Sequence, residues 1–206
     1  MDRPNPAPDP ALALELALTI RHDGHGGVAD DLTDPTGLTD WVRRRPTSFG
    51  YGFDAAGYTA DPANLGQVRQ LRNAVRALFA RAVRPAPPSS ADASRLLPVP
   101  DALEVLNAAA GRAPAVPVLR WPEGGRPVLS PAPAGPAAPG DLLLTALATA
   151  AGVFLASPDA ARLRACHAPR CVRYFLKEHP RQEWCKPACG NRARVARHHE
   201  RHRPAG

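Results

Sequence analysis

Aromatic residues are scarce in this chain: they make up 5% of its 206 residues, whereas hydrophobic residues as a whole reach 44%. The hydrophobic content is sufficient for a core, and the shortage of aromatics means that alanine, leucine and valine must fill it. A long uninterrupted apolar run is also missing. Residues 142–156 are apolar over 15 positions, whereas a membrane-spanning helix needs about 20. These shortages favour a globular protein without a membrane partner.

A secretion signal is not visible near the N-terminus. The apolar stretch ALALELALTI is interrupted by Glu15 and follows proline and aspartate rather than basic residues. We therefore expect a cytoplasmic protein, in which thiols stay reduced. In that environment the four cysteines are better suited to metal binding than to disulfide formation.

Proline and, towards one end, positive charge are in excess. Of the 25 prolines, 13 fall between Pro85 and Pro139, which predicts an interrupted middle segment. From residue 162 onwards there are 12 lysines and arginines against 3 acidic residues, whereas the first 161 residues have 14 against 16. A nearly neutral body with a basic C-terminal segment is typical of proteins that bind nucleic acid or another polyanion. A solubilising tail is the alternative.

Helices are predicted over much of the first 160 residues. The clearest covers 61–83, where Asp61 suits the N-cap, Pro62 suits the first turn, and apolar residues recur every three or four positions. Three arginines on its opposite face are predicted to be solvated: Arg69, Arg72 and Arg76. Shorter helices are predicted at 11–20, where the alternating leucines also permit a strand, at 35–44, at 101–110 with Asp101 as cap, and at 141–157 with Asp141 as cap.

One β-hairpin is predicted, with strands at 116–121 and 126–129 around a Pro-Glu-Gly-Gly turn. The stretch RHDGHGGVADD, 21–31, is predicted to be a glycine-rich loop. The fold class predicted from these elements is α+β, with a mainly helical N-terminal domain and a C-terminal zinc finger of treble-clef-like or ribbon-like form. The predicted boundaries are 1–130 for the N-terminal domain, 131–140 for a Pro/Ala linker, 141–160 for a bridging helix packed on that domain, and 161–206 for the finger.

The four cysteines form two close pairs, Cys166-x4-Cys171 and Cys185-x3-Cys189, with 13 residues between the pairs. Two such pairs are a common way to assemble a tetrahedral Zn²⁺ site, and four thiolates leave no open coordination position. The spacing therefore predicts one structural zinc ion rather than a catalytic one. Disulfides and inert or redox-active cysteines are the alternatives.

Histidines are potential rival ligands. His167 lies between the first two cysteines, and His198 and His202 are four residues apart on a predicted helix, a spacing compatible with a second metal site. No carboxylate other than Glu200 is close to that pair. A solvated or phosphate-facing role is therefore favoured for these histidines.

Between the cysteine pairs, 172–176 is predicted to be a strand and 177–184 a turn with a return strand. A module of this size cannot bury a large core, so zinc is expected to supply much of its folding free energy. Its small core is predicted to consist of Tyr174, Phe175 and Trp184, with base stacking as the alternative role for Trp184.

A basic helix is predicted to begin near Pro187. At about 100° per residue, the cysteines face one side of this helix and Arg194, Arg197 and Arg201 share the other. We expect these arginines to contact DNA phosphates and one or two guanine bases, with His198 beside them.

Residues on the zinc side of this helix are expected to support the finger. Asn191 and Arg192 are interpreted as a hydrogen-bonded brace, together with Trp184, and Arg192 could also reach one phosphate. Gly190 is expected to permit a close approach of another part of the chain.

The segment RLRACHAPRC…FLKEHPRQEWCKPACGNRARVARHHER resembles the CGNR zinc finger, whose name-giving motif stands here as Cys189-Gly190-Asn191-Arg192. Upstream, LALELALTIRHDG…DDLTDPTGLTDWVRR and LRNAVRALF are similar to the ABATE domain. That family's Asp-Phe-x-Asn-Thr pattern is replaced here by ELALT, 15–19. The resemblance implies a bacterial, stress-related transcription regulator that binds zinc through Cys166, Cys171, Cys185 and Cys189.

These observations together predict a zinc-dependent, DNA-binding transcription regulator that is not an enzyme and is associated with the nucleoid. The N-terminal domain is expected to sense a small-molecule ligand or to form a homodimer, because one finger offers few base contacts. An RNA- or ribosome-associated zinc module and a protein-interaction finger are alternatives. A further alternative is a small enzyme that uses His22, Asp23, His25 and Asp30.

Overall fold

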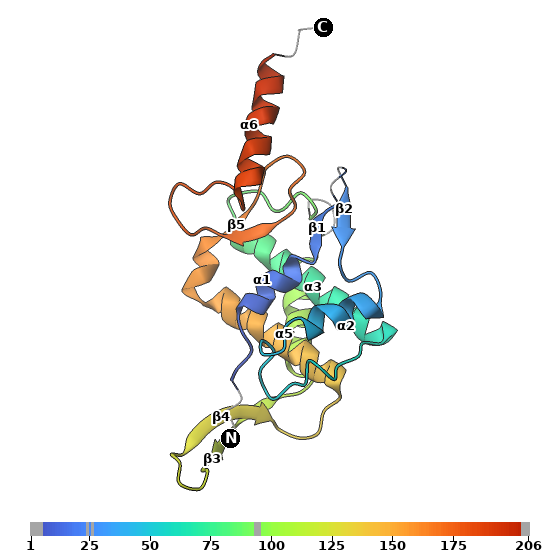
Figure 1. The fold of residues 1–206 in the computed structure, drawn as a ribbon, viewed down its shortest axis with the longest axis vertical. Coiled ribbons are helices and arrows are strands. Elements are labelled where there is room, and N and C mark those ends of the chain that lie inside the picture. The colour runs from blue at the N-terminus through green and yellow to red at the C-terminus, as the bar shows by residue number, and fades with distance from the viewer. Residues whose placement is uncertain (1–5, 24, 26, 93–95, 203–206) are drawn as a thin grey trace.

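The computed structural model describes residues 6–23, 25, 27–92 and 96–202. The fold is mixed α+β and mostly helical, and its described strands pair into three separate antiparallel hairpins. In Figure 1, the β3–β4 hairpin extends from one end of a helical body and the C-terminal helix α6 from the other. The helices are α1 (Ala11–Ala17), α2 (Pro35–Arg43), α3 (Pro62–Ala82), α4 (Val99–Ala110), α5 (Pro139–Ala156) and α6 (Pro187–Arg201), and the strands are β1 (Ile20–His22), β2 (Val28–Asp30), β3 (Ala115–Arg120), β4 (Val128–Pro133), β5 (Leu163–Ala165) and β6 (Tyr174–Leu176).

The helix starts follow local sequence signals, and two predicted caps are wrong. Asp61 accepts a hydrogen bond from the Asn64 amide at 2.7 Å, which confirms it as the N-cap of α3. Asp101 and Asp141 lie inside the first turns of α4 and α5 instead of capping them. Proline in the first two positions starts each of these helices earlier than the aspartate. The carboxylates are still favourable there, because they face the positive end of the helix dipole.

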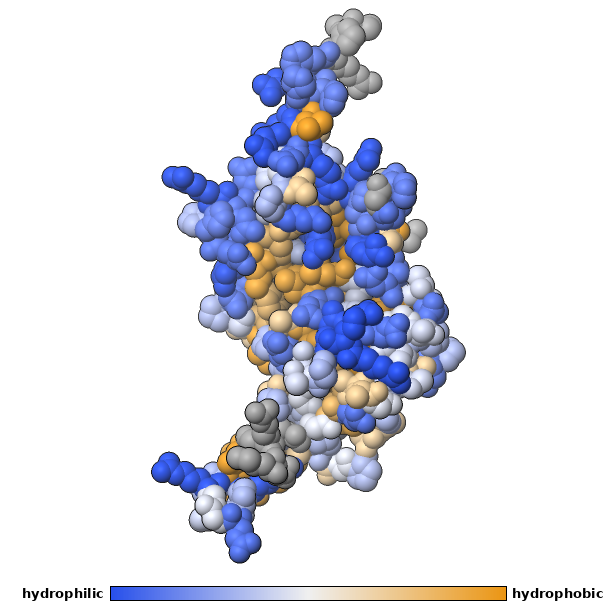
Figure 2. All heavy atoms as spheres, in the orientation of Figure 1, coloured by the Kyte–Doolittle hydropathy of each residue, from blue (hydrophilic) through white to orange (hydrophobic). Residues whose placement is uncertain are grey.

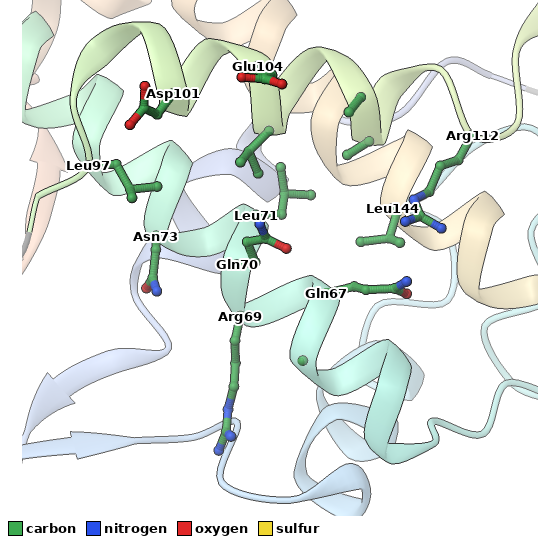
Figure 3. A pocket seen from close by; sticks show the side chains of 14 residues that line it. Gln67, Arg69, Gln70, Leu71, Asn73, Leu97, Asp101, Glu104, Arg112 and Leu144 are labelled. Carbon is green, nitrogen blue, oxygen red and sulfur yellow. The ribbon is translucent and has the colours of Figure 1, made fainter.

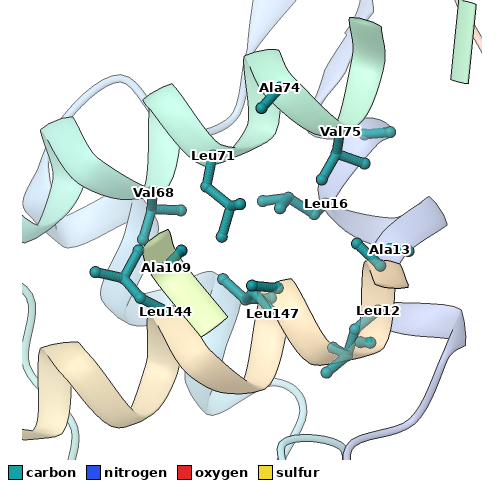
Figure 4. Close-up of a cluster of buried hydrophobic side chains, with 14 of the residues drawn as sticks. Leu12, Ala13, Leu16, Val68, Leu71, Ala74, Val75, Ala109, Leu144 and Leu147 are labelled. Carbon is teal, nitrogen blue, oxygen red and sulfur yellow. The ribbon is translucent and has the colours of Figure 1, made fainter. Parts of the chain in front are cut away.

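The main core lies between α1, α3, α4 and α5 (Figure 4). Leucines and valines from α1, α3 and α5 interlock there, and alanines such as Ala74 and Ala109 allow the helices to approach closely. The segment predicted as a bridging helix, α5, is thus a central core helix. By length and composition alone α5 could cross a membrane, but one side of it is buried against the other helices of the body.

Two β-hairpins differ from the sequence-based expectation. The stretch predicted as a glycine-rich loop forms the β1–β2 hairpin, with Ile20 opposite Asp30 and His22 opposite Val28. Its strands have three residues each, too few to show an alternating pattern. The predicted β3–β4 hairpin is confirmed, but β4 continues to Pro133 and α5 starts at Pro139, so part of the expected linker 131–140 is regular structure.

The arginines of α3 are not a solvated face, which contradicts the sequence-based prediction. Arg72 and Arg76 are only 4% and 3% exposed. Arg72 forms two hydrogen bonds with the Asp30 carboxylate, at 2.5 and 2.7 Å, and Arg69 donates to the Leu32 and Thr33 carbonyl oxygens. The helical period explains part of this error, because Arg72 lies four residues after Val68 and three before Val75 and so belongs at the edge of the apolar stripe rather than opposite it.

Candidate metal centre and basic helix

The first two cysteines lie in a tight turn between β5 and β6. The Cys166 amide donates to the Arg173 carbonyl at 2.9 Å, and the Cys171 amide donates to the Ala168 carbonyl at 2.9 Å. Arg170 completes the turn with a left-handed φ of 64°. Because β6 pairs with β5, the predicted return strand at 177–184 is wrong: these residues are irregular, and the strand partner precedes the first cysteine instead of following the turn.

The second pair of cysteines lies at the start of α6. Cys185 directly precedes the N-cap residue Lys186, and Cys189 lies in the first turn, where it is fully buried. All four Sγ atoms lie within 4.8 Å of one another, the one such group of potential metal ligands within the described ranges. The Sγ atom of Cys185 is 3.7 Å from that of Cys171 and 3.5 Å from that of Cys189. A tetrahedral zinc ion with Zn–S bonds of about 2.3 Å needs sulfur atoms about 3.8 Å apart, so this donor set fits Zn²⁺.

The crowded thiols perturb one another's protonation. The neighbouring thiols of Cys171 and Cys185 donate hydrogen bonds to Cys166 and lower its pKa to about 2. The same contact with Cys166 raises the pKa of Cys171 to about 11, and contacts with Cys166 and Cys171 raise the pKa of Cys185 above its ordinary value. Zinc binds thiolates, so it must displace these protons, and its binding is favoured as the pH rises.

The aromatic residues of the finger divide between two cores. Phe175 and Trp184 pack around the cysteines as predicted. Tyr174 instead belongs to the main core, where its ring centroid is 5.5 Å from that of Phe79 and its hydroxyl donates to Asp92 at 2.7 Å. The prediction for Tyr174 is wrong because neighbouring residues of a strand face opposite sides, and the helical body covers one side of β6.

Arg192 and Asn191, which follow Cys189, make contacts with different parts of the finger. Arg192 Nη2 lies 3.1 Å from Cys189 Sγ, a charge-assisted contact with a zinc-ligand candidate. Asn191 is exposed and accepts a hydrogen bond from Arg194. The Asn191 side chain therefore bonds to Arg194 in α6 and not to the cysteine turn.

Gly190 packs tightly against Trp184. A Cβ atom at Gly190 would lie 3.0 Å from Trp184 Cδ1, closer than side chains normally approach. We expect Gly190→Ala to destabilise the finger by about 1–3 kcal/mol through overpacking and to weaken zinc retention against a chelator. Gly66→Ala is the matched control, because nothing lies within 4 Å of the added Cβ in α3. It should stabilise the protein by about 0.5–1 kcal/mol. Equal denaturant unfolding curves for the two variants would contradict this account.

The predicted arginine stripe lies on the free side of α6. Arg194, Arg197 and Arg201 are exposed, whereas Cys189 and Ala193 of the same helix are buried. Within the described part of the chain no ion pair joins these three arginines to a carboxylate. Figure 1 shows α6 projecting away from the body, and Figure 2 shows hydrophilic side chains over most of its length.

The histidines do not join the cysteine group. His167 is exposed and its ring is not among the clustered ligand atoms. The rings of His198 and His202 lie 4.2 Å apart between centroids, and His202 Nδ1 is 2.9 Å from the His198 carbonyl oxygen. No third potential ligand joins that pair among the described residues, so a second metal site gains no support.

Sequence reasoning missed a second basic feature beside the finger. A cleft of about 260 Å³ separates the β1–β2 hairpin from the cysteine turn, and its walls include Arg21, Arg173, Lys186 and Arg192. Arg21 is far from the others in the sequence, so no local pattern could reveal this grouping. The excess of positive charge after residue 161 was the one sequence signal for Arg173, Lys186 and Arg192.

A wide groove of about 760 Å³ runs between α3 and α4 (Figure 3). Leu71 and Leu144 form part of its lining, and Asp101 and Glu104 line the α4 side. Arg112, at one end, pairs with Asp141 at 2.9 Å. This groove is open and distant from the cysteines.

The residues considered for an enzymatic site have structural partners. Asp23 Oδ1 accepts hydrogen bonds from the His25 and Gly27 amides at 2.8 and 2.9 Å and so closes the β1–β2 turn. Burial raises the pKa of Asp30, but hydrogen bonds from Arg72 and from a backbone amide outweigh this effect and hold it below 3.8. A carboxylate held in this way is a weak base at neutral pH.

Two family models match this sequence. Residues 10–158 match the ABATE family, described as "Putative stress-induced transcription regulator". Residues 162–202, which include all four cysteines and α6, match the CGNR zinc finger. No match was found among curated proteins. The cysteine group is thus the site of one Zn²⁺ ion in a zinc finger.

Proposed function

Because the chain belongs to the ABATE family of transcription regulators and ends in a CGNR zinc finger, we propose that it binds duplex DNA through α6. The observation that supports this most directly is the exposed arginine stripe Arg194, Arg197 and Arg201, which no described carboxylate neutralises. A projecting basic helix fits the major groove, where phosphate contacts fix its position and arginine can read guanine.

The zinc ion has a structural role in this proposal. Cys166, Cys171, Cys185 and Cys189 ligate it and leave no position for a reacting molecule. The zinc therefore joins the cysteine turn to the first turn of α6 and sets the angle at which the helix leaves the body. Arg192 and Trp184 brace the site. The protein acts in the cytoplasm at the nucleoid and is not an enzyme.

Additional phosphate contacts come from the cleft beside the finger. Arg21, Arg173 and Lys186 line it together with Arg192, and His198 flanks the arginine stripe on α6. Four thiolates and one Zn²⁺ carry a net charge of about −2, which part of this positive charge offsets. Arg21 is paired with Asp31 at 2.6 Å and Asp23 also lines the cleft, so the phosphate contacts proposed here fall to Arg173 and Lys186 beside the finger.

The N-terminal unit, 1–130, and helix α5 share one core, and together they carry the finger, which begins near 161. The connection between β4 and α5 is shorter than the predicted linker 131–140, because β4 ends at Pro133 and α5 starts at Pro139. A single finger contacts few base pairs, so useful sequence preference requires a homodimer or a partner. The N-terminal unit is the part of the chain available to supply that contact or to bind a small-molecule signal.

Single alanine substitutions of Arg194, Arg197 and Arg201 test the DNA face. We expect each to weaken DNA binding while zinc content stays at one per chain, because each side chain is exposed and outside the group of zinc ligands. A lost phosphate contact should reduce the slope of log K against log salt by about 1, and a lost base contact should cost about 1–3 kcal/mol at one base position. Fluorescence anisotropy across a salt series measures both.

The matched control is Arg126→Ala, an exposed arginine in the β3–β4 turn at the opposite end of the molecule. Its affinity and salt slope should equal those of the unaltered protein. If Arg192→Ala alone weakens binding, the assignment of the DNA face to the outward stripe is wrong. Equal affinity for single-stranded RNA and duplex DNA, without sequence preference, would instead favour the RNA-associated alternative.

A further inference from the structure

The four cysteines of the finger differ in how well the chain covers them. Cys166, Cys171 and Cys189 are buried, with exposures of 1%, 4% and 0%, whereas Cys185 is only partly buried. Cys185 directly precedes Lys186, the N-cap residue of α6, and so lies at the outer edge of the ligand group. Buried structural cysteines are inert, whereas partly exposed thiolates react with dissolved reagents. Exposure therefore distinguishes Cys185 from the other three ligands.

The three buried sulfur atoms also accept hydrogen bonds from N–H groups. The donors are main-chain amides for two of these sulfur atoms and a guanidinium for the third. They are the Ala168 and Cys185 amides for Cys166, the Arg173 amide for Cys171, and Nη2 of Arg192, at 3.1 Å, for Cys189. Such hydrogen bonds withdraw electron density from a thiolate and make it a weaker nucleophile.

The sulfur atom of Cys185 lies among other sulfur atoms. It is 3.7 Å from the sulfur of Cys171 and 3.5 Å from that of Cys189, and it also contacts Cys166. Among the described residues, no amide or guanidinium donor to this sulfur is found. In the zinc-bound site the neighbouring sulfur atoms are thiolates, which have no proton to donate. Cys185 is therefore both the most exposed ligand and the one without an N–H donor from the described chain.

Cys171 is the nearest rival for reaction with a dissolved reagent, because it lines the cleft of about 260 Å³ beside the finger. However, its exposure is only 4%, and the Arg173 amide donates to its sulfur. Both properties lower its reactivity relative to that of Cys185.

We propose that Cys185 is a modification site for α,β-unsaturated carbonyl compounds, and that its alkylation weakens zinc retention and so releases α6. Thiolate sulfur is soft and polarizable, which suits attack on carbon. Its electron pair forms the S–C bond at the β-carbon, the C=C π pair moves to the carbonyl as an enolate, and water supplies the final proton. The product is a neutral thioether in place of a zinc-binding thiolate. The reactivity is independent of the proposed function, whereas its effect on DNA binding rests on it.

The order in which the cysteines react is the primary test. N-ethylmaleimide is the probe, and its saturated analogue N-ethylsuccinimide is the matched control reagent. Zinc-bound, full-length protein should be treated with less than one equivalent, because zinc loss exposes the other thiols, and the labelled residue identified by peptide mass spectrometry. We expect Cys185 to react about tenfold faster than each other cysteine. First reaction at Cys166, Cys171 or Cys189, or equal rates at all four, overturns the proposal.

Substitution of Arg192 tests the part played by the N–H donors. Arg192→Met removes the donor to Cys189 and should raise the reaction rate of that cysteine about tenfold. Arg192→Lys keeps the charge and should restore part of the protection. Arg181→Met, which removes an exposed arginine between the cysteine pairs, should leave the order unchanged. An unchanged Cys189 rate in Arg192→Met overturns the protective role of the hydrogen bond. If this variant does not retain zinc, the order in the unaltered protein decides the proposal.

Zinc release and DNA binding are separate readouts of the consequence. Release to a chromophoric chelator should rise in step with modification of Cys185, to about one zinc per modified chain, and DNA binding should be lost in the same sample. N-ethylsuccinimide should cause neither change. Modified protein that keeps its zinc against the chelator overturns the release step. Selective reaction and zinc release in a protein that binds no DNA before treatment would overturn only the proposed function.

Discussion

Replacing Cys185 and Cys189 together with serine is expected to remove zinc from the protein and to unfold the finger. These residues supply half of a closed four-thiolate site, and serine oxygen is a poor replacement for a thiolate. Structural zinc sites contribute apparent binding free energies of about 10–16 kcal/mol at neutral pH, so the finger should not remain folded without the ion. Elemental analysis should fall from about one zinc per chain to none, and DNA binding should be lost.

His167→Ala is the matched control for this experiment. His167 lies between the first two cysteines and is the nearest rival ligand in the sequence, but it is exposed and outside the ligand group. Its replacement should leave zinc content and DNA affinity unchanged. A double cysteine variant that retains stoichiometric zinc would refute the assignment of the site.

Loss of zinc should also weaken the N-terminal body. Leu163, Ala165 and Tyr174 from β5 and β6 belong to the main core and not to the cysteine cluster. Unfolding the finger therefore removes packing from the body. We expect the helical circular dichroism signal to persist, with a lower unfolding temperature than in the zinc-bound protein.

Arg76→Ala is expected to destabilise the protein by about 3–5 kcal/mol, because it leaves the buried Asp92 carboxylate without a counter-charge, with only the Tyr174 hydroxyl still donating to it. Arg76 is 3% exposed, and its guanidinium also donates to the Ala17 carbonyl at 2.6 Å. Because Arg76 also donates to the Val172 carbonyl, the substitution should destabilise the finger as well. Chemical denaturation of the zinc-bound protein measures the change in the free energy of unfolding.

Arg81→Ala supplies the comparison, because Arg81 is an exposed arginine of the same helix. Its effect should stay within about 0.5 kcal/mol. The double variant Arg76→Ala/Asp92→Ala should lose less free energy of unfolding than the two single variants lose in sum. The reason is that the second substitution removes the charge that the first leaves unpaired. Additive losses would show that the two side chains do not act as a pair.

The cysteine site was largely predictable from the sequence. Two close pairs of cysteines predicted one zinc site, and the period of the helix placed Arg194, Arg197 and Arg201 opposite the cysteines. Both inferences depend on residues that lie close together in the chain. The start of α3 at Asp61 and Pro62 was predictable for the same reason, because capping involves only neighbouring residues.

Errors arose where a side chain meets a distant segment. Arg72 and Arg76 were predicted to lie on a solvated face of α3, but their spacing places them at the edge of the apolar stripe. There they pair with Asp30 and Asp92, which come from segments on either side of α3 in the sequence. Tyr174 was assigned to the finger because it lies between the cysteines, but it packs with Phe79 of the body. In each case the partner that buries the side chain is remote in the sequence.

The sequence by itself determined the zinc site, the family, the mostly helical α+β class and the basic helix after the cysteines. These properties follow from residue types and short spacings, which the local geometry of turns and helices converts into structure. Only the tertiary structure decided that two arginines of α3 are buried and that finger and body share a core. These features require segments that are remote in the chain to pack together, and packing depends on the complete three-dimensional arrangement rather than on local pattern.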